Sequence, residues 1–387
     1  MDRDSSFLTH AISAPDFTGN KAHRSRLTDE LRNYLDRNLI LVVAPAGYGK
    51  TTFLADFTTR ADLPVCWIRL SPADQDPARL ASLVWESLCR RFRRLRSELS
   101  LSSEAGITPQ ALARTIGRTL NEKVPEPFAL IIDDFHLIHP STEATRFVDG
   151  LLAELPPNST MIVVSRELPR LSLAQWIAND QVKTFGPEEL ALTMGELTDL
   201  VEKRTGSSLD SEVAGEVLAE TEGWVTGVLL SDRLVSQALP TLAARDQSLA
   251  YEYLAQTAFH RESPDVQTFM MRSAVMPIMT ADACDRVLER ANSQAMLSRL
   301  LRKGLFVSAT GSSPRIYEYH HLFRAFLLEQ LEQENPELAD ELRLAAADHF
   351  SDSDWPEVAF ELAAEAGAFD RAAAIAEDHV DRLFELG

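Results

Sequence analysis

The sequence predicts an α/β domain with a parallel β-sheet, followed by helical modules and a winged-helix domain. In the first half, short apolar runs alternate with amphipathic helical segments, which is typical of strands and helices in a doubly wound sheet. Strand signals stop after residues 182–190, and helical patterns continue from there. A later pair of β-rich runs flanks a turn and indicates a hairpin among those helices.

The expected strands of the sheet are short continuous apolar runs bounded by Pro, Gly, Asn or Asp. Runs of this kind suit strands that are buried on both faces of a parallel sheet. They cover residues 39–44, 65–70, 128–134 and 160–166. Between the second and third strands, residues 78–99 predict one amphipathic helix. Its apolar stripe recurs at steps of three and four residues and consists of Trp85, Leu88, Phe92, Leu95 and Leu99.

The second half predicts three further modules. Residues 188–240 have helical patterns, and residues 251–335 combine short helices with the hairpin "LFVSATGSSPRIYEYHH", whose turn is Gly-Ser-Ser-Pro. From residue 336 the chain is rich in alanine, which lets helices stack closely in repeats that need neighbours to bury their faces. We expect such an array to continue beyond this chain. The predicted domains are a nucleotide-binding domain 1–187, a helical domain 188–250, a winged helix 251–335 and the start of the repeats 336–387.

Composition narrows the class of protein. The formal net charge is −20, whereas a nucleic-acid-binding domain normally presents a basic face, so we do not expect these residues to bind DNA. Cys66, Cys89 and Cys284 are far apart and lack the spacing of a zinc site, which favours free thiols in a cytoplasmic protein. We find no secretory signal pattern and no apolar run long enough to span a membrane, so no membrane partner is expected.

The segment "RNLILVVAPAGYGKTTFLADF", residues 37–57, has the order of strand, glycine-containing loop and helix that binds phosphate. Gly47 and Gly49 allow the backbone to bend and approach oxygen atoms closely. Lys50 is expected to reach the β- and γ-phosphates, and the Thr51 hydroxyl to bind Mg²⁺. Ala44 stands where the common pattern has glycine, but at the strand end a methyl group need not touch phosphate. The nucleotide-contacting residues predicted here are Pro45, Ala46, Gly47, Tyr48, Gly49, Lys50, Thr51 and Thr52.

A second motif, "ALIIDDFHLI", is an apolar strand that ends in two acids. Asp133 is predicted to hold Mg²⁺ through water, and Asp134 to polarise an attacking water. The strand at 65–70 is expected to be the added strand between the two motifs that is found in P-loop ATPases with an extra catalytic acid. Arg166 follows the fourth strand and is a candidate γ-phosphate sensor; the alternative is a surface ion pair. For both motifs together, the alternative is an ordinary α/β domain with a glycine turn.

These motifs resemble the STAND class of signal-transduction ATPases and, within it, the MalT-like group of large bacterial regulators of the LuxR type. The resemblance covers nearly the whole chain. It is carried, in family order, by "APAGYGKTT", "CWIRLSPADQDPARL", "LIIDDFHLI", "AETEGWVTGVLL", "SQAMLSRLLRKGLFV" and "YEYHHLFRAFLLEQL".

The resemblance implies a layout and a mode of action. ADP is held between the first three domains and keeps such proteins closed. Exchange of ADP for ATP, helped by a small-molecule or protein inducer that downstream repeats sense, opens them and drives self-association. DNA is then bound only through a C-terminal effector, of which this chain has no segment.

Single positions can be carried over from the resemblance. His320 falls where related switches place a histidine against the ADP β-phosphate, with a packing histidine as the alternative, and His321 competes for the same role. "TEGWVTG" lacks the proline that packs on adenine in other STAND proteins, so Trp224 or Val225 is the candidate for that contact. Arg24 and Arg26 match an arginine-bearing segment before the first strand, where nucleotide contact and a solvated face are the two possibilities.

Three classes of function remain from the sequence. The leading one is a nucleotide-controlled switch that hydrolyses ATP slowly and regulates transcription in its full-length form. The second is a substrate-stimulated ATPase that remodels a protein or nucleic-acid partner, and the third is a scaffold that binds nucleotide without hydrolysing it. Five arginines within residues 90–96 indicate either a solvated helix face or a docking patch for an acidic neighbour.

Overall fold

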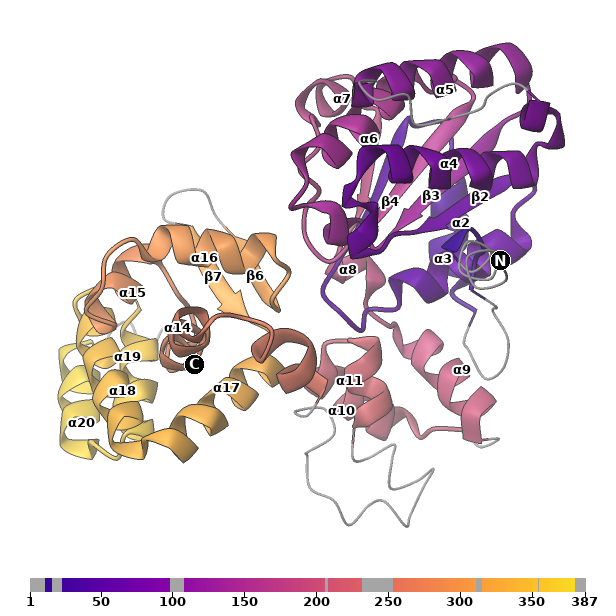
Figure 1. The fold of residues 1–387 in the computed structure, drawn as a ribbon. Coiled ribbons are helices and arrows are strands. Elements are labelled where there is room, and N and C mark those ends of the chain that lie inside the picture. The colour runs from indigo at the N-terminus through magenta and orange to yellow at the C-terminus, as the bar shows by residue number, and fades with distance from the viewer. Residues whose placement is uncertain are drawn as a thin grey trace. The chain divides into compact units, whose positions relative to one another are not determined.

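The computed structural model describes residues 11–15, 23–97, 108–205, 208–231, 253–310, 315–353 and 355–379 (Figure 1). Four features predicted from the sequence lie outside the described residues: Leu99 of the apolar stripe, the Gly-Ser-Ser-Pro turn at 311–314, the end of the helical domain at 232–250, and the chain end at 380–387. The chain forms two compact units, Met1–Leu229 and Leu230–Gly387, which we describe separately.

A five-stranded sheet organises the first unit, and all of its strand pairs are parallel. Its order is β2-β3-β4-β1-β5. The bounds are β1 Leu39–Val43, β2 Val65–Arg69, β3 Phe128–Asp133, β4 Ser159–Ser165 and β5 Val182–Phe185. The four predicted strands are therefore confirmed, and β5 is an edge strand that the sequence analysis did not assign.

One prediction about this sheet is wrong. The strand at 65–70 does not lie between the strands of the two motifs; β2 forms an edge and contacts β3 alone. The strand inserted between β1 and β3 is β4, whose Met161–Ser165 pair with Leu39–Val43. Order along the chain does not fix order across a parallel sheet, because each crossover helix can place the next strand on either side.

Helices surround this sheet (Figure 1). α4, α5 and α6 share a continuous apolar core with one of its faces. Polar N-cap residues fix where two of these helices begin. The side-chain hydroxyl of Thr108 accepts a hydrogen bond from a backbone N–H of α5, and that of Ser141 accepts one from a backbone N–H of α6. The remaining bounds are α2 Ser25–Arg32, α3 Lys50–Arg60, η1 Pro72–Gln75, α4 Pro77–Arg91, η2 Arg93–Ser97, α5 Pro109–Lys123, η3 Phe135–Ile138, α6 Thr142–Glu154, α7 Ala174–Ala178, α8 Pro187–Leu190, α9 Met194–Thr205, α10 Ser211–Thr221 and α11 Val225–Leu230.

The helix predicted over residues 78–99 is shorter than expected. α4 ends at Arg91, Phe92 leaves the helical conformation with φ −113° and ψ 84°, and the short η2 follows. Phe92 and Leu95 are nevertheless buried in the same core as the α4 stripe. The apolar pattern correctly predicts the buried side of the segment but does not reveal the break in the backbone.

The second unit contains the predicted winged helix. Short helices precede an antiparallel hairpin in which Val307 pairs with Tyr319. Polar contacts anchor the hairpin: Tyr319 Oη shares a 2.9 Å hydrogen bond with the Ser273 hydroxyl, and both residues are buried. The bounds are η4 Ala255–Phe259, α14 Pro264–Ser273, α15 Ala281–Val287, α16 Ser293–Arg302, β6 Val307–Thr310, β7 Ile316–Tyr319 and α17 His321–Glu334.

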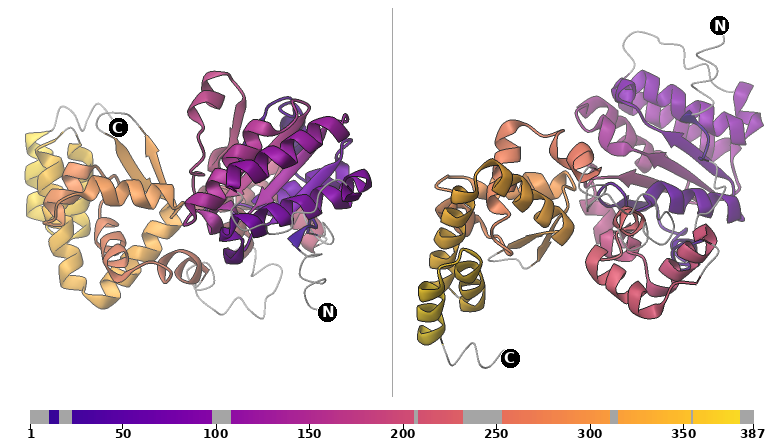
Figure 2. Two further views of the ribbon diagram at one scale, coloured as in Figure 1. Left: turned by 45° about the horizontal axis from the view of Figure 1, so that its top comes forward. Right: turned by 90° about the horizontal axis from the view of Figure 1, so that it is seen from below.

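The alanine-rich end of the chain forms three helices that stack side by side (Figure 2). They are α18 Pro336–Ser351, α19 Pro356–Glu365 and α20 Phe369–Asp378. Ala346, Ala347, Ala359 and Ala363 are buried, as expected where small side chains let helices approach closely. Within the described ranges, no helix is both long and apolar enough to cross a lipid bilayer.

Candidate nucleotide-binding site

The loop between β1 and α3 has the geometry of a phosphate-binding loop. Gly47 and Gly49 take left-handed conformations with φ of 84° and 75°. The Lys50 ammonium folds back over the loop, and its Nζ donates to the carbonyl oxygens of Ala44 at 2.6 Å and Pro45 at 2.8 Å. A cation held above backbone turned in this way is what a polyphosphate requires.

The departure from the common motif at Ala44 is explained by burial. Ala44 is 1% exposed at the end of β1, and its backbone amide donates to Ser165 of β4 at 3.3 Å. Its methyl group is therefore buried in packed protein, and the contribution of Ala44 at this position comes from its backbone. The missing glycine removes no group on which a nucleotide depends.

Residues at the start of α11 contact the outer side of this loop. Trp224 is fully buried, and its Nε1 donates to the carbonyl oxygen of Ala46 at 3.0 Å. The backbone amide and the hydroxyl of Thr226 both donate to the carbonyl oxygen of Gly47 at 3.1 Å. The helical segment thus contacts the loop backbone directly. The sequence analysis named Trp224 as a possible adenine contact, but it did not identify Thr226.

Substituting Gly47 is expected to be strongly disruptive. A Cβ at this position would lie 2.5 Å from Trp224 Nε1 and 2.6 Å from Thr226 Oγ1, and φ is 84°. We expect Gly47→Ala to lower the free energy of unfolding by about 1–3 kcal/mol and to displace α11 from the loop. Gly195→Ala on α9 is the matched control, because nothing lies within 4 Å of its Cβ. Chemical denaturation of both variants would measure this, and equal stabilities would contradict the proposed contact.

The acidic motif lies next to the phosphate loop. Asp133, fully buried at the end of β3, accepts from the Thr51 hydroxyl at 3.1 Å and 3.3 Å. Burial, reinforced by the charge of Asp134, raises the pKa of Asp133 to about 6. A hydroxyl and a buried carboxylate in contact are the pair that holds Mg²⁺ beside a nucleotide. The structure thus brings together Thr51 and Asp133, the two predicted metal residues.

Asp134 takes a left-handed conformation with φ 59° and is partly exposed. Arg69, the last residue of β2, lies near both acids: its Nη2 is 3.6 Å from Asp133 Oδ2, and its Nε is 3.7 Å from Asp134 Oδ2. The sequence analysis missed Arg69. Its signal was the end position of a parallel strand, because the carboxyl ends of neighbouring strands share one edge of the sheet.

Positive charges gather around the loop. Burial, assisted by the charge of Arg166, lowers the pKa of Lys50 to about 8, although Asp133 and Asp134 oppose the change. The pKa of His136 is lowered to about 4 by burial and by the charges of Arg166 and Lys50. Arg166 is half-buried, and its predicted role as a γ-phosphate sensor stays a prediction. His139 instead bonds Glu167, with its Nδ1 2.6 Å from Oε1.

A cavity of about 250 Å³ opens beside the loop within the first unit. Gly49 and Thr52 line it from the loop and α3, apolar side chains form much of the remaining wall, and Arg24, Asp56 and Arg204 add charged groups. A largely apolar wall with a few polar groups suits a flat heteroaromatic base. The apolar members are Phe53, Leu192, Leu200, Val225 and Leu229. Val225 therefore lines the space next to the loop, whereas Trp224 is hydrogen-bonded to the loop backbone.

Arg24 and Arg26 lie near this site but bond to protein groups. Arg24 is 6% exposed, and it donates to the carbonyls of Leu190 and Ala191 and to Glu196 at 3.0 Å. Arg26 is more exposed and donates to the carbonyl of Glu189 at 2.9 Å. Arg24 is therefore not on a solvated face, which was one of its two predicted alternatives. It also lines the 250 Å³ cavity. Contact of either arginine with nucleotide stays a prediction.

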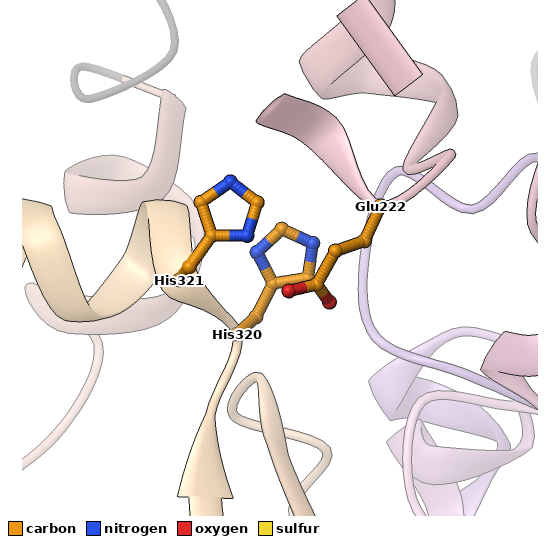
Figure 3. Close-up of side chains that lie close together, drawn as sticks. All are labelled: Glu222, His320 and His321. Atoms are coloured by element: carbon orange, nitrogen blue, oxygen red, sulfur yellow. The ribbon is translucent and has the colours of Figure 1, made fainter. Parts of the chain in front are cut away.

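His320 belongs to the second unit, where it occupies the N-cap position of α17 directly after β7, without a capping hydrogen bond from its side chain (Figure 3). Its backbone amide donates to the carbonyl of Phe306 at 2.8 Å, and its ring stacks on that of His321 with centroids 5.0 Å apart. His320 is 9% exposed, so local packing already restrains it. Its predicted role at a phosphate is untested, as is the choice between it and His321.

Comparison with known proteins finds similar sequences among transcriptional regulators. Residues 255–339 match the model of the MalT winged helix domain. The chain is 29% identical over 340 residues to the HTH-type transcriptional regulator MalT of Serratia proteamaculans, covering 84% of this chain and 36% of that protein. It is 26% identical over 398 residues to the MalT regulator of Vibrio cholerae, covering 98% and 43%. The chain thus spans about two fifths of the length of these relatives.

A solved structure supports the fold. A Walker-type ATPase of Pyrococcus abyssi superposes with a TM-score of 0.53 at 12% identity, covering 81% of this chain and 99% of that one. At that identity the likeness concerns the fold alone. Together with the two sequence motifs, it establishes a P-loop ATPase fold for the first unit. Residues 255–339 match the MalT winged-helix model, and the chain as a whole is similar in sequence to MalT regulators.

Proposed function

We propose that this chain is the nucleotide-controlled switch of a transcriptional regulator, closed with ADP and opened by ATP together with an inducer. The observation that carries the proposal is the contact between α11 and the phosphate loop. The carbonyl oxygens of Ala46 and Gly47 accept hydrogen bonds from Trp224 and Thr226. A conformational change in the loop would therefore directly displace the start of α11. An enzyme that needed its loop only for catalysis would not require this connection.

The residues present fit a magnesium–nucleotide complex. Lys50 bonds to carbonyls of its own loop, which are partners it can exchange for phosphate oxygens without moving its backbone. Thr51 and Asp133 would hold Mg²⁺, and Pro45 to Thr52 would surround the phosphates with backbone N–H groups. The bound Mg²⁺ would neutralise charge on the phosphates. The 250 Å³ cavity, lined by Val225, would take the base.

Hydrolysis in this arrangement is slow and serves to reset the switch. Asp134 would orient and deprotonate an attacking water, while Arg69, whose Nε lies 3.7 Å from Asp134 Oδ2, competes for its carboxylate. Arg166 would contact the γ-phosphate and distinguish ATP from ADP. A population shift requires this difference, because a ligand that binds both conformations equally shifts nothing.

An inducer, a second copy of the chain and DNA are the partners of the proposed switch beyond the nucleotide. We propose that repeats continuing from α18–α20 sense the inducer, that ATP promotes self-association, and that a separate effector segment binds DNA. A cytoplasmic location suits such a protein, and Cys66, Cys89 and Cys284 are buried free thiols. The net charge of −20 fits a segment that leaves DNA contact to another part of the protein.

Sedimentation velocity tests the switch. We expect the protein with Mg²⁺ and a non-hydrolysable ATP analogue to sediment differently from the protein with ADP, because opening or self-association changes its frictional ratio or mass. Lys50→Ala should give one profile with both nucleotides. Identical profiles of the wild-type protein, combined with rapid steady-state turnover, would contradict the switch and favour an energy-using ATPase.

A further inference from the structure

A second cavity in the first unit lies beside β2, at the edge of the sheet that is separated from β1 by β3 and β4. Its volume is about 770 Å³, within the range of small-molecule sites. Four segments form its walls: residues 12–15, α3 through Thr58, β2, and α4 through Ser87, Arg90 and Arg91. Arg90 Nη1 donates to Ser13 Oγ at 2.7 Å, so one wall is bonded to α4.

The charge of this cavity is opposite to that of the chain. Arg69, Arg90 and Arg91 line it, and no carboxylate is among the lining residues in the part of the chain that the structure describes. The other arginines of the 90–96 run behave differently: Arg94 pairs with Glu126 at 2.5 Å, and Arg93 and Arg96 are exposed outside the cavity. The arginine run therefore separates into a part that lines the cavity and a part that does not.

Trp67 adds a second, independent observation. It lines the same cavity, is 2% exposed, and its Nε1 has no hydrogen-bond partner. A buried N–H group without an acceptor is unfavourable, because it has lost its hydrogen bonds to water. Ile12, Pro15 and Val65 supply apolar surface around it. An acceptor on a bound molecule would satisfy a group that the chain itself leaves unsatisfied.

Arg69 connects this cavity to the acidic motif. It lies 3.6 Å from a carboxylate oxygen of Asp133 and 3.7 Å from one of Asp134, which are loose ion pairs on a side chain that is 46% exposed. An anion in the cavity that attracted Arg69 would compete with both carboxylates. It would free Asp134 to act on water and would change the field in which Asp133 holds Mg²⁺.

We propose that the cavity beside β2 binds a small anionic molecule with a carboxylate or phosphate group and an apolar part, and that its binding regulates the nucleotide site through Arg69. We favour a small molecule over a protein segment, because the volume of about 770 Å³ lies within the range of small-molecule sites. The claim that the anion regulates the nucleotide site rests on the proposed function. The claim that the cavity binds an anion does not.

The fluorescent sulfonate 8-anilinonaphthalene-1-sulfonate is a suitable probe, because it combines an anion with aromatic rings and accepts energy from tryptophan. We would titrate it into protein saturated with Mg²⁺ and ADP, so that the phosphate loop is blocked. Saturable binding is expected. Arg91→Glu should weaken it at least about tenfold, a difference of about 1.4 kcal/mol. The control, Arg93→Glu with Arg96→Glu, changes twice the charge outside the cavity and should leave the affinity within about twofold.

Competition identifies the anionic group: displacement by orthophosphate indicates a phosphate ligand, and displacement by citrate a carboxylate ligand. Absence of saturable binding would overturn the proposal, as would an equal loss in the control. If Arg91→Glu abolished self-association while probe binding was unaffected, the arginines would form a protein-docking surface instead.

Regulation by the anion has its own readout. The competing anion should change the rate of ATP hydrolysis in the wild-type protein. Arg69→Gln should remove that response even at anion concentrations that saturate the cavity of the variant, as judged by probe displacement. Probe binding can also be measured without nucleotide in Lys50→Ala. Failure of the switch and failure of this site are therefore distinguishable. An unchanged rate at saturating anion in a protein that hydrolyses ATP would contradict regulation by the anion.

Discussion

Lys50→Ala is expected to weaken the binding of ADP and ATP at least about a hundredfold. The Lys50 ammonium now bonds two loop carbonyls and would exchange them for two charge-assisted hydrogen bonds to phosphate. Losing such bonds costs about 1.5–3 kcal/mol each. Since burial already lowers the pKa of Lys50 to about 8, the ammonium adds little to stability without nucleotide, and the empty protein should unfold much as the wild type does.

Isothermal titration calorimetry with both nucleotides measures this effect. Lys203→Ala is a matched control, because Lys203 is an exposed lysine in the last turn of α9. It should bind nucleotide as the wild type does. Unchanged affinity in Lys50→Ala would show that the loop is not the phosphate site.

Asp134→Asn is expected to slow ATP hydrolysis by about two to four orders of magnitude while leaving ADP affinity within about threefold. General-base catalysis contributes a rate factor of this size. Asn tolerates positive φ better than most residues, so the backbone at φ 59° should persist. The substitution therefore removes the charge of the carboxylate with little effect on the shape of the site.

Single-turnover hydrolysis of radiolabelled ATP is the measurement, because a reset rate can be too slow for steady-state assays. Asp180→Asn makes the same chemical change at another left-handed aspartate, with φ 55°, that pairs with Arg37 at the far end of the sheet. It should hydrolyse ATP at the wild-type rate. Equal rates in Asp134→Asn and the wild type would assign the base elsewhere.

Much of the fold could be predicted from the sequence, because its strongest signals are local. Strands β1 to β4 are continuous apolar runs, and the hairpin has two such runs with Tyr317 and Tyr319 buried. β5 was missed because at the sheet edge its residues are only partly buried until Phe185. The order of the strands across the sheet could not be predicted either, because the crossover connections that decide it have no sequence pattern of their own.

Residues of the candidate nucleotide site could be predicted where they belong to one sequence motif. Residues that only the fold brings to the site were not predicted. Gly47, Lys50 and Thr51 lie in one loop, and the spacing of the motif identifies them. Arg69 and Thr226 reach the site from β2 and α11, and neither belongs to a motif. Arg24 shows the limit of a resemblance: its contact with nucleotide stays a prediction, whereas burial and its bond to Glu196 give it a structural role that the sequence did not reveal.

The central claim is that ADP is part of the resting structure of this protein, and the nucleotide released on denaturation tests it most directly. The purified chain should release close to one ADP per chain, identified by ion-exchange chromatography of the acid-quenched supernatant. At about a hundred times its dissociation constant, ADP would add about 2.7 kcal/mol to the stability of the closed form. An empty site that exchanges nucleotide rapidly and turns ATP over continuously would contradict the switch and leave a P-loop ATPase of a different kind.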